Sequence, residues 1–319
     1  MKQRRISFAI TALFLLNGGL WCFAQTPDAT PALIKSPIVV FDEREHYHKG
    51  LKREDFLLEV NNQPLPIDYF SNQEAPASIV FLVDTSGSMK NRVGETSRYS
   101  FLPAAVKRFL QLTHPDNEYL IASFGLEPRI RLDWTAAPDE VFKALIALAD
   151  EKPQGLTNLR DACYFGLAQA RRGTKAKKVV VLVSDGQDTS DDSRVKSIKP
   201  KLLNQELMEN NVQIYVLNVS IFLQAGSALS LIGEDWLNSL VRPSGGRVFS
   251  PRNAADLNYS LELLALTLYA QYEIGFYPPP AFVQSRNYKI KIRLASQAVE
   301  KYKLKNMTVR YREGFSLPR

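Results

Sequence analysis

The sequence of 319 residues has few histidines and cysteines, two residue types that often take part in catalysis. It contains three histidines and two cysteines, Cys22 and Cys163. Cys22 lies in a segment that we expect to be removed, so Cys163 stands alone and no intrachain disulfide can form. The stretch 159–168 around Cys163 has a helical pattern, and free cysteine is among the most buried residue types. We therefore expect Cys163 in a core, with a reactive thiol as the alternative.

The chain also lacks a dominant charge of one sign. It has 40 Lys and Arg against 33 Asp and Glu, but three of the basic residues fall within the first 24 positions. Of the rest, ten lie in residues 286–319 beside two glutamates, so residues 25–285 carry a net charge of −4. A nucleic-acid-binding protein normally shows a dominant basic face. We expect no nucleic-acid partner, and the 45% hydrophobic content is that of a globular protein.

No segment after residue 24 is long and apolar enough to span a membrane, and the first 24 residues resemble a signal peptide. Three basic residues lie in positions 1–5, and an apolar run over 6–16 is broken by Asn-Gly-Gly at 17–19. Small residues then precede a cleavage site after Ala24. A retained anchor is the alternative, but a spanning helix needs about 20 apolar residues. We expect an exported protein, periplasmic or secreted to the cell surface, without a transmembrane span after cleavage.

The middle of the chain alternates apolar runs with amphipathic segments. We expect strands at 79–83, 119–124, 130–134, 179–183 and 212–217, and helices at 101–112, 138–149, 160–170, 202–209 and 236–241. This order predicts an α/β fold with a doubly wound, mostly parallel sheet. Such sheets bind ligands at the carboxyl ends of their strands.

Both flanks have a β pattern instead. Strands are expected within 37–70, at 271–277 and 288–294, and again within 301–311, after a helix at about 254–270. Neither flank has enough strands to bury a core alone. We therefore predict that 25–75 and 254–319 combine into one small accessory β-domain beside an α/β domain over 76–253.

The polar residues that carry chemistry follow the expected buried strands. Asp84, Ser86 and Ser88 form a D-x-S-x-S cluster after the first, Thr157 precedes a helix, and Asp185 follows the strand at 179–183. Two carboxylates and three hydroxyls make an oxygen-only set that suits a hard divalent cation, most simply Mg²⁺, with Mn²⁺ and Ca²⁺ as alternatives. Neutral hydroxyls leave the ion electropositive, so an anionic group of a partner could complete its coordination.

This pattern resembles the von Willebrand factor A (VWA) domain over about 76–253. The five residues match the family's metal-ion-dependent adhesion site (MIDAS), in which the Ser and Thr hydroxyls contact the ion and the aspartates often act through water. The flanks, at Gly50–Phe56, Gln271–Pro278 and Val309–Phe315, resemble a group of exported bacterial VWA-related proteins first noted in acidobacteria. That second resemblance implies no known activity.

Two functions from different classes fit these residues. The first is a non-enzymatic adhesion module that grips an Asp or Glu of a protein partner through its bound ion, outside the cytoplasm. The second is a metal-dependent hydrolase in which the ion activates water, which needs a general base such as His or Glu nearby. Since no histidine lies near these loops in the sequence, we expect the first and predict that the protein is not an enzyme. A purely structural ion is a third interpretation.

Two weaker patterns remain. His46 and His48 would lie on one side of a strand as a zinc pair, but a solvated turn is the simpler interpretation. Basic residues alternate with apolar ones over 289–294 and 301–305, which places the charges on one face of each strand. That face could contact anionic polymers of the envelope, or its lysines could protect exposed strand edges from aggregation.

Overall fold

The computed structural model describes residues 32–89, 100–220, 228–283 and 286–317. Its contacts divide the chain after Ala32, and residues 33–319 form the unit described below. The expected signal peptide and Cys22 lie outside the described residues. None of the helices in the described ranges has the length and apolarity needed to cross a membrane.

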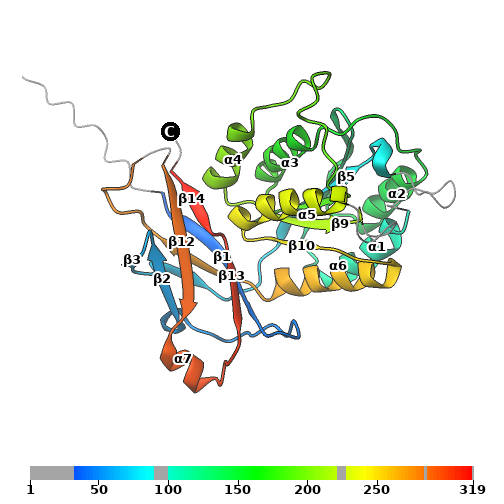
Figure 1. Ribbon diagram of the computed structural model, residues 1–319. Coiled ribbons are helices and arrows are strands. Elements are labelled where there is room, and N and C mark those ends of the chain that lie inside the picture. The colour runs from blue at the N-terminus through cyan, green and yellow to red at the C-terminus, as the bar shows by residue number, and fades with distance from the viewer. Residues whose placement is uncertain (1–31, 90–99, 221–227, 284–285, 318–319) are drawn as a thin grey trace, which may run out of the picture. The chain divides into compact units, whose positions relative to one another are not determined.

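A six-stranded sheet in the order β10-β9-β8-β5-β6-β7 forms the centre of this unit (Figure 1). Its strands are β5 (Ala77–Asp84), β6 (Glu118–Phe124), β7 (Pro128–Thr135), β8 (Lys177–Ser184), β9 (Gln213–Asn218) and β10 (Arg247–Phe249). All neighbours pair in parallel except β6 and β7, which are antiparallel. The predicted α/β fold with a mostly parallel sheet is confirmed.

Helices cover both faces of this sheet, because the central strands carry apolar side chains on both faces. In β5, Ile79, Phe81 and Val83 pack into one core with α1 (Leu102–Leu112), α2 (Pro138–Ala149) and α6 (Ala254–Tyr269). The alternate residues Val80 and Leu82 pack into a second core with α3 (Leu159–Arg172), α4 (Pro200–Glu209) and α5 (Ala228–Val241). Successive side chains of a strand point to opposite faces, which explains this division. Cys163 on α3 is buried in the second core, as predicted.

Two four-stranded antiparallel sheets are built from strands of both flanks. The strands are β1 (Ile34–Phe41), β2 (Phe56–Val60), β3 (Gln63–Leu65), β4 (Tyr69–Ser71), β11 (Tyr272–Phe276), β12 (Asn287–Leu294), β13 (Thr308–Tyr311) and β14 (Gly314–Ser316). They pair in the orders β13-β1-β11-β4 and β14-β12-β2-β3 around a third apolar core. Because residues 33–319 form one compact unit by contacts, the domain boundaries near 76 and 253 remain a proposal.

The basic end of the chain differs from its expected strands in two respects. Residues 296–301 form a short helix, α7 (Ser296–Lys301), and only Thr308–Tyr311 of the expected 301–311 is a strand. Between them Lys303 and Asn306 adopt positive φ angles of 55° and 59°, which are turn conformations. In addition, β12 pairs with β14 over 287–289 and with β2 over 290–294. Protection of a sheet edge by its lysines stays a prediction.

Candidate metal-binding site

The two predicted carboxylates lie at the carboxyl edge of the central sheet. Asp84 is the last residue of β5, and Asp185 directly follows β8. The two strands are parallel neighbours, with Val83 opposite Val183. Consequently both aspartates leave the sheet at the same edge, beside each other.

Asp84 is fully buried, and the backbone of the following turn fixes its carboxylate. One oxygen accepts a hydrogen bond from the Ser86 backbone N–H (2.9 Å), and the other accepts one from the Ser184 hydroxyl (2.8 Å). Burial, and secondarily the charge of Asp185, raise the pKa of Asp84 to about 7. A second buried carboxylate beside it makes this position costly for negative charge and favourable for a cation.

The two serine hydroxyls join the aspartates in one cluster. A short 3-10 turn, η2 (Gly87–Met89), follows Ser86 and brings Ser88 back towards it. The hydroxyls of Ser86 and Ser88 are 3.1 Å apart, and Ser88 donates a hydrogen bond to Asp185 (3.3 Å). The structure therefore places four of the five predicted residues in direct hydrogen-bonding contact.

Thr157 reaches the same edge by way of backbone contacts between two loops. The Gly87 N–H donates to the Gly155 carbonyl (3.0 Å), and the Gln154 N–H donates to the Thr85 carbonyl (2.9 Å). These bonds hold the loop before α3 against the D-x-S-x-S turn. Among the hydrogen bonds of the described residues, none joins the Thr157 side chain to the other four.

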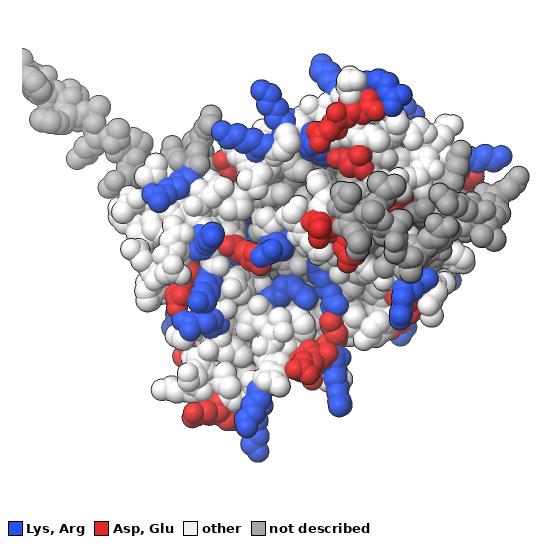
Figure 2. Space-filling view, viewed as in Figure 1, with Lys and Arg blue, Asp and Glu red and all other residues white. Residues whose placement is uncertain are grey.

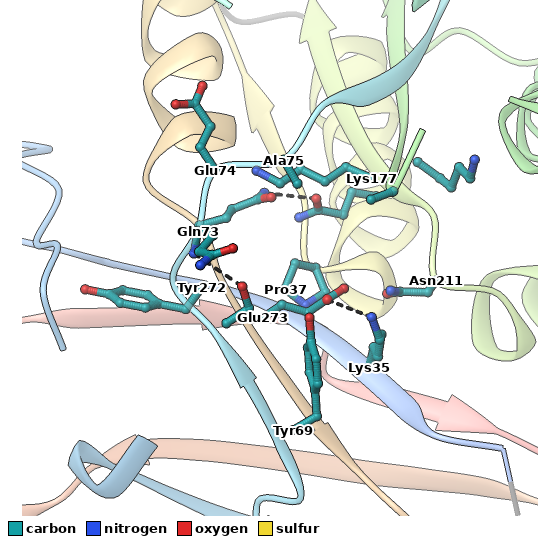
Figure 3. A pocket seen from close by; sticks show the side chains of 15 residues that line it. Lys35, Pro37, Tyr69, Gln73, Glu74, Ala75, Lys177, Asn211, Tyr272 and Glu273 are labelled. Carbon is teal, nitrogen blue, oxygen red and sulfur yellow. Dashed lines mark hydrogen bonds and ion pairs between the residues drawn. The ribbon is translucent and has the colours of Figure 1, made fainter. Parts of the chain in front are cut away.

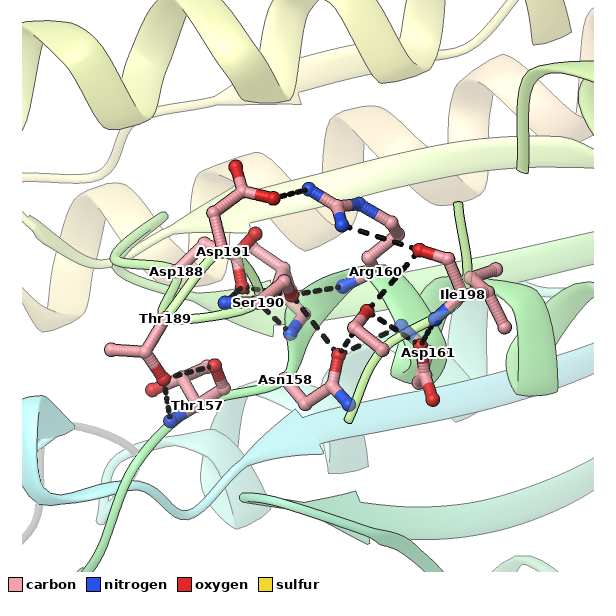
Figure 4. Close-up of polar contacts among 11 residues, drawn as sticks. Thr157, Asn158, Arg160, Asp161, Asp188, Thr189, Ser190, Asp191 and Ile198 are labelled. Carbon is pink, nitrogen blue, oxygen red and sulfur yellow. Dashed lines mark hydrogen bonds and ion pairs between the residues drawn. The ribbon is translucent and has the colours of Figure 1, made fainter. Parts of the chain in front are cut away.

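A polar network that the sequence did not reveal fixes the Thr157 loop from its other side (Figure 4). The Thr157 carbonyl accepts from the backbone N–H (2.9 Å) and hydroxyl (2.6 Å) of Thr189. The next residue, Asn158, caps α3 and also accepts from the hydroxyls of Ser190 and Ser197, each at 3.0 Å. The Thr157 backbone is thus held at both ends.

The acidic run from Asp185 to Asp192 contributes to this network. Asp188 accepts from the Leu159 N–H at the start of α3 (3.0 Å). Asp191 accepts from the guanidinium of Arg160 (2.8 Å), whose other arm donates to the Ile198 carbonyl (3.2 Å). The sequence shows that this run is acidic, but only the fold shows which backbone amides and which cation the carboxylates contact.

The chemistry of the donor set fits a divalent cation. Asp84, Ser86, Thr157 and Asp185 are buried, and every candidate ligand atom is a carboxylate or hydroxyl oxygen. A hard cation such as Mg²⁺ prefers such oxygens. No group of three or more His, Cys, Asp or Glu side chains in the described ranges could hold an ion, so here the hydroxyls would complete a shell begun by two carboxylates.

The histidine pair considered from the sequence has other contacts. His46 Nδ1 lies 3.0 Å from Asp42, and the His48 ring packs against Tyr302 with centroids 6.0 Å apart. The third histidine, His114, lines a small pocket beside Ala77, the first residue of β5. Asp84 ends the same strand, so the strand length of roughly 23 Å separates the two ends.

Comparisons with known proteins identify a domain family within the chain. The family model of the von Willebrand factor type A domain matches residues 79–187. The chain is 21% identical over 204 residues to the uncharacterized protein YwmC of Bacillus subtilis, covering 58% of this chain and 81% of that protein. It is 28% identical over 131 residues to inter-alpha-trypsin inhibitor heavy chain H4 of Sus scrofa, covering 39% of this chain and 14% of the heavy chain.

Among solved structures, a variant of the PilB minor pilin from Streptococcus sanguinis aligns with a TM-score of 0.48 and 13% identity. The alignment covers 62% of this chain and 63% of the pilin. The matched region is thus less than two thirds of both the pilin and the heavy chain.

Proposed function

Because this chain carries a von Willebrand factor type A domain, a fold that commonly mediates protein–protein interaction, we propose that it is a metal-dependent adhesion module. In this proposal Asp84, Ser86, Ser88, Thr157 and Asp185 hold one Mg²⁺, which grips an Asp or Glu of a protein partner. The observation that carries it is the buried pair Asp84 and Asp185, bridged by serine hydroxyls at the carboxyl edge of the sheet. When bound, the ion would neutralise the two carboxylates and offer a coordination position to the partner.

A groove beside the predicted metal site supports an acidic partner. It has a volume of about 370 Å³, and one of the residues that line it is Thr85, within the D-x-S-x-S turn. Arg129, Arg131 and Lys152 line it together with Glu127 and Glu151. Arg131 already pairs with Glu151 (2.8 Å). Arg129 and Lys152 together outweigh Glu127, so the lining carries one net positive charge, which complements acidic residues around the carboxylate that would reach the ion.

A metal-dependent hydrolase is the alternative, and the placement of the histidines disfavours it. Water activation needs a general base within hydrogen-bonding reach of the reacting water. His46 and His48 contact residues of the flanking segments, and His114 lies at the opposite end of β5 from Asp84. Of the two glutamates in the neighbouring groove, Glu151 is paired with Arg131, which leaves Glu127 as the carboxylate that a hydrolase could use. We retain a binding role as the proposal, and with it the absence of enzymatic activity.

The charge distribution does not suggest a nucleic-acid partner. Figure 2 shows Lys and Arg interspersed with Asp and Glu over the described part of this face, without a continuous basic surface. Electrostatic binding to a phosphate backbone relies on such a surface. A protein partner remains our proposal.

We further propose that the module acts outside the cytoplasm, in the periplasm or at the cell surface. The basis is the leader pattern of residues 1–24. Intact mass of exported protein should show a chain that begins near Gln25. A chain that keeps Met1 would instead be held at the membrane by its apolar segment.

Calorimetry with Mg²⁺ and Mn²⁺ tests the metal site directly. The Asp84→Ala variant should lose metal binding and keep its fold, because Asp84 is the last residue of β5, at the edge of the sheet, and belongs to neither apolar core of the α/β region. The Thr157→Ala variant should bind more weakly but measurably, since a water can replace a neutral hydroxyl. An Asp116→Ala variant, at an exposed turn away from the site, is the matched control and should bind as the unchanged protein does. Equal affinity in all four proteins would contradict the proposed ligands.

The partner is tested by affinity capture from the envelope of the source organism. Capture should occur with Mg²⁺ and fail with EDTA or with the Asp84→Ala variant. A partner retained equally under all three conditions would show that the ion, where it binds, is structural.

A further inference from the structure

The helix α6 carries an apolar stripe on each of two opposite faces. The inner stripe is buried in the core that α6 shares with α1 and α2, and it consists of Leu257, Leu261, Leu264 and Leu268. On the opposite face, Tyr259, Leu266 and Tyr269 are each about half exposed, at 55%, 49% and 46%. A surface helix of a globular protein normally presents one apolar stripe to its core and polar residues to solvent. The outer stripe is therefore a feature that the fold of the chain does not explain.

Contacts on the inner side and on one flank hold α6 in place. The Tyr47 hydroxyl lies 2.5 Å from the Thr267 hydroxyl. Lys177, which lines the pocket drawn in Figure 3, donates to the Leu268 carbonyl in the last turn of the helix. The outer stripe is thus presented by a fixed element, and a preorganised surface loses less conformational entropy when it binds a partner.

The outer stripe has the residue spacing of a seam between two helices. Its members follow one another at steps of four, three, four and three residues, in the order Ala255, Tyr259, Glu262, Leu266 and Tyr269. Alternating steps of this kind keep one side of a helix against a second helix over its whole length. Apolar residues scattered singly over a surface need no partner, whereas a contiguous exposed group indicates an interaction surface. The spacing therefore indicates that this surface takes a helix.

The order of side-chain sizes favours a second copy of α6 in the reverse direction. With a two-fold axis at Glu262, Tyr269 of one copy lies opposite Ala255 of the other, and Tyr259 lies opposite Leu266. Large side chains opposite small ones fill the space between two helices without voids or overlap. A parallel pair would instead place Tyr269 against Tyr269 and Ala255 against Ala255. The stripe thus complements itself best when the second copy is antiparallel.

The charges along the stripe also fit a second copy. Glu262 pairs with Arg108 of α1 (3.2 Å), and both side chains remain partly exposed. At the two-fold axis the carboxylates of both copies would meet beside both guanidinium groups, so the four charges sum to zero. The Lys49 ammonium covers the Tyr269 ring, 3.5 Å from its centroid, and adds one positive charge at the end of the stripe. A partner of strong charge of either sign has little to complement here.

The available area predicts a dimer of modest strength. The 16 residues of α6 extend over about 24 Å. Its neighbour α1 continues the surface, because Leu112 is exposed one turn after Arg108. Two helices about 10 Å apart offer a face of roughly 500 Å². Stable interfaces bury about 800 Å² per partner and weak ones less than about 600 Å², so the dimer should dissociate on dilution.

We propose that the outer stripe of α6 binds a second copy of this chain and forms a two-fold symmetric, antiparallel dimer. The helix runs from the carboxyl edge of the central sheet, where β10 ends, to the opposite edge, where Lys177 begins β8. An antiparallel pair therefore directs the two carboxyl edges in opposite directions. This inference goes beyond the adhesion function proposed above, because it uses none of the predicted metal ligands. A dimer of this kind would present two metal sites to two different partners.

Sedimentation velocity of the purified full chain, from low micromolar to several hundred micromolar concentration, tests the dimer. The mass should rise from that of one chain towards that of two. Leu266→Glu should keep the chain monomeric over this range, because it places a carboxylate against Tyr259 and near Glu262. Leu202→Glu, at an exposed leucine of α4, is the matched control and should associate as the unchanged protein does. The proposal is wrong if the unchanged protein stays monomeric throughout, or if Leu266→Glu associates equally well.

Cross-linking tests the antiparallel register. The background carries Cys22→Ser, so that the buried Cys163 is the remaining native thiol. A mixture of an Ala255→Cys chain with a Tyr269→Cys chain should form a disulfide-linked dimer, whereas either chain alone should not. A cross-link formed by Ala255→Cys alone would show a parallel pair and overturn the proposed arrangement, as would a mixture that forms no cross-link.

Discussion

At the scale of single residues, the surroundings of Asp84 decide whether its carboxyl group is charged. Its carboxylate is fully buried, it faces a second carboxylate, and both raise its pKa to about 7. In metal-free protein this shift opposes folding at neutral pH, because the unfolded chain ionises the group at its ordinary, lower pKa. A bound cation would remove that penalty. Through Asp84, the folding stability would therefore depend on both the pH and the binding of metal.

We therefore expect the metal-free protein to become less stable as the pH rises from about 4, the ordinary pKa of an aspartate, to about 7, the pKa of Asp84 in the folded protein. The folded-state pKa is raised, so the contribution of Asp84 is complete below its unfolded pKa and is lost as the pH passes the folded one. The loss is at most about 4 kcal/mol, from a shift of roughly three pKa units. Asp84→Asn should flatten this dependence, as measured by urea unfolding in EDTA.

An exposed aspartate gives the control for this experiment. Asp116→Asn should leave the pH dependence unchanged, since its side chain is 74% exposed. Adding Mg²⁺ should restore stability at neutral pH to the unchanged protein and not to Asp84→Asn. A pH dependence that survives in Asp84→Asn would assign it to another group.

The residues of this site differ in how far the sequence could predict their placement. Asp84 and Asp185 each follow a recognisable buried strand, and parallel neighbours end at the same edge, so their proximity followed from the pattern. The hydrogen bond from Ser184 to Asp84 did not, although both end adjacent strands, because serine at a strand end is common. The bonds around Asn158 depend on how three loops fold together, which no local pattern specifies.

At the scale of elements, the contact between two loops sets the geometry of the site. A Cβ added at Gly87 would lie 3.1 Å from the Gly155 carbonyl oxygen, closer than an ordinary contact. Gly125 lies in the same loop cluster, but a Cβ there would be 3.4 Å from the Leu156 oxygen, an ordinary separation. The two glycines therefore form a matched pair for testing whether loop spacing controls the site.

Gly87→Ala should push the Thr157 loop away from the D-x-S-x-S turn. We expect Mg²⁺ affinity to fall several-fold, on the order of 1 kcal/mol, with a stability loss of about the same size. Gly125→Ala should change Mg²⁺ affinity much less. Calorimetry and thermal unfolding of both variants provide the measurement, and equal effects would indicate general loosening of the loops.

The strand β12 shows where a one-dimensional pattern was sufficient and where it was not. Its alternation of exposed basic and buried apolar residues is present as predicted. The similar alternation over 301–305 is instead a helix end and a turn, because residues 296–301 favour a helix and Lys303 takes a positive φ. Alternation over five residues cannot distinguish these outcomes, whereas a full strand of eight residues can.

Lys289 lies in the stretch of β12 that pairs with β14, and Lys291 lies in the stretch that pairs with β2, so edge protection and contact with an anionic polymer both stay predictions for these lysines. The second predicts weak retention of the protein on an anionic matrix, lost at high salt, since each lysine near an anionic surface contributes about 1 kcal/mol. Changing both lysines to Gln should reduce the salt concentration needed for elution. Changing Lys107 and Lys143, on helices of the α/β region, to Gln should have a smaller effect, and equal shifts would point to net charge alone.

At the scale of the whole described unit, the two ends of the chain depend on each other. β1 lies between β11 and β13, and β2 lies between β12 and β3. Each carboxyl-terminal sheet thus has its central partner supplied from the start of the chain. Arg312 adds a link to the α/β region: it is buried, and its guanidinium donates to the Met208 carbonyl at α4 (2.8 Å).

Deleting residues 25–75 should consequently leave the carboxyl-terminal strands without partners. Strands β11 and β12 would expose their apolar faces and unpaired backbone groups, a condition that promotes aggregation and proteolysis. We expect lower solubility and rapid protease cleavage within 271–317, while the α/β region around Asp84 stays resistant. Limited proteolysis with mass spectrometry locates the cuts.

A shorter deletion separates loss of pairing from loss of chain length. Removing only residues 25–31, which precede β1, should leave the carboxyl end resistant, because every described strand keeps its partner. If the 25–75 deletion also keeps a resistant carboxyl end, the strands at 272–316 fold without their amino-terminal partners. The pairing between the chain ends would then be a consequence of folding and not a requirement for it, and the two flanks would have to be treated as separate units.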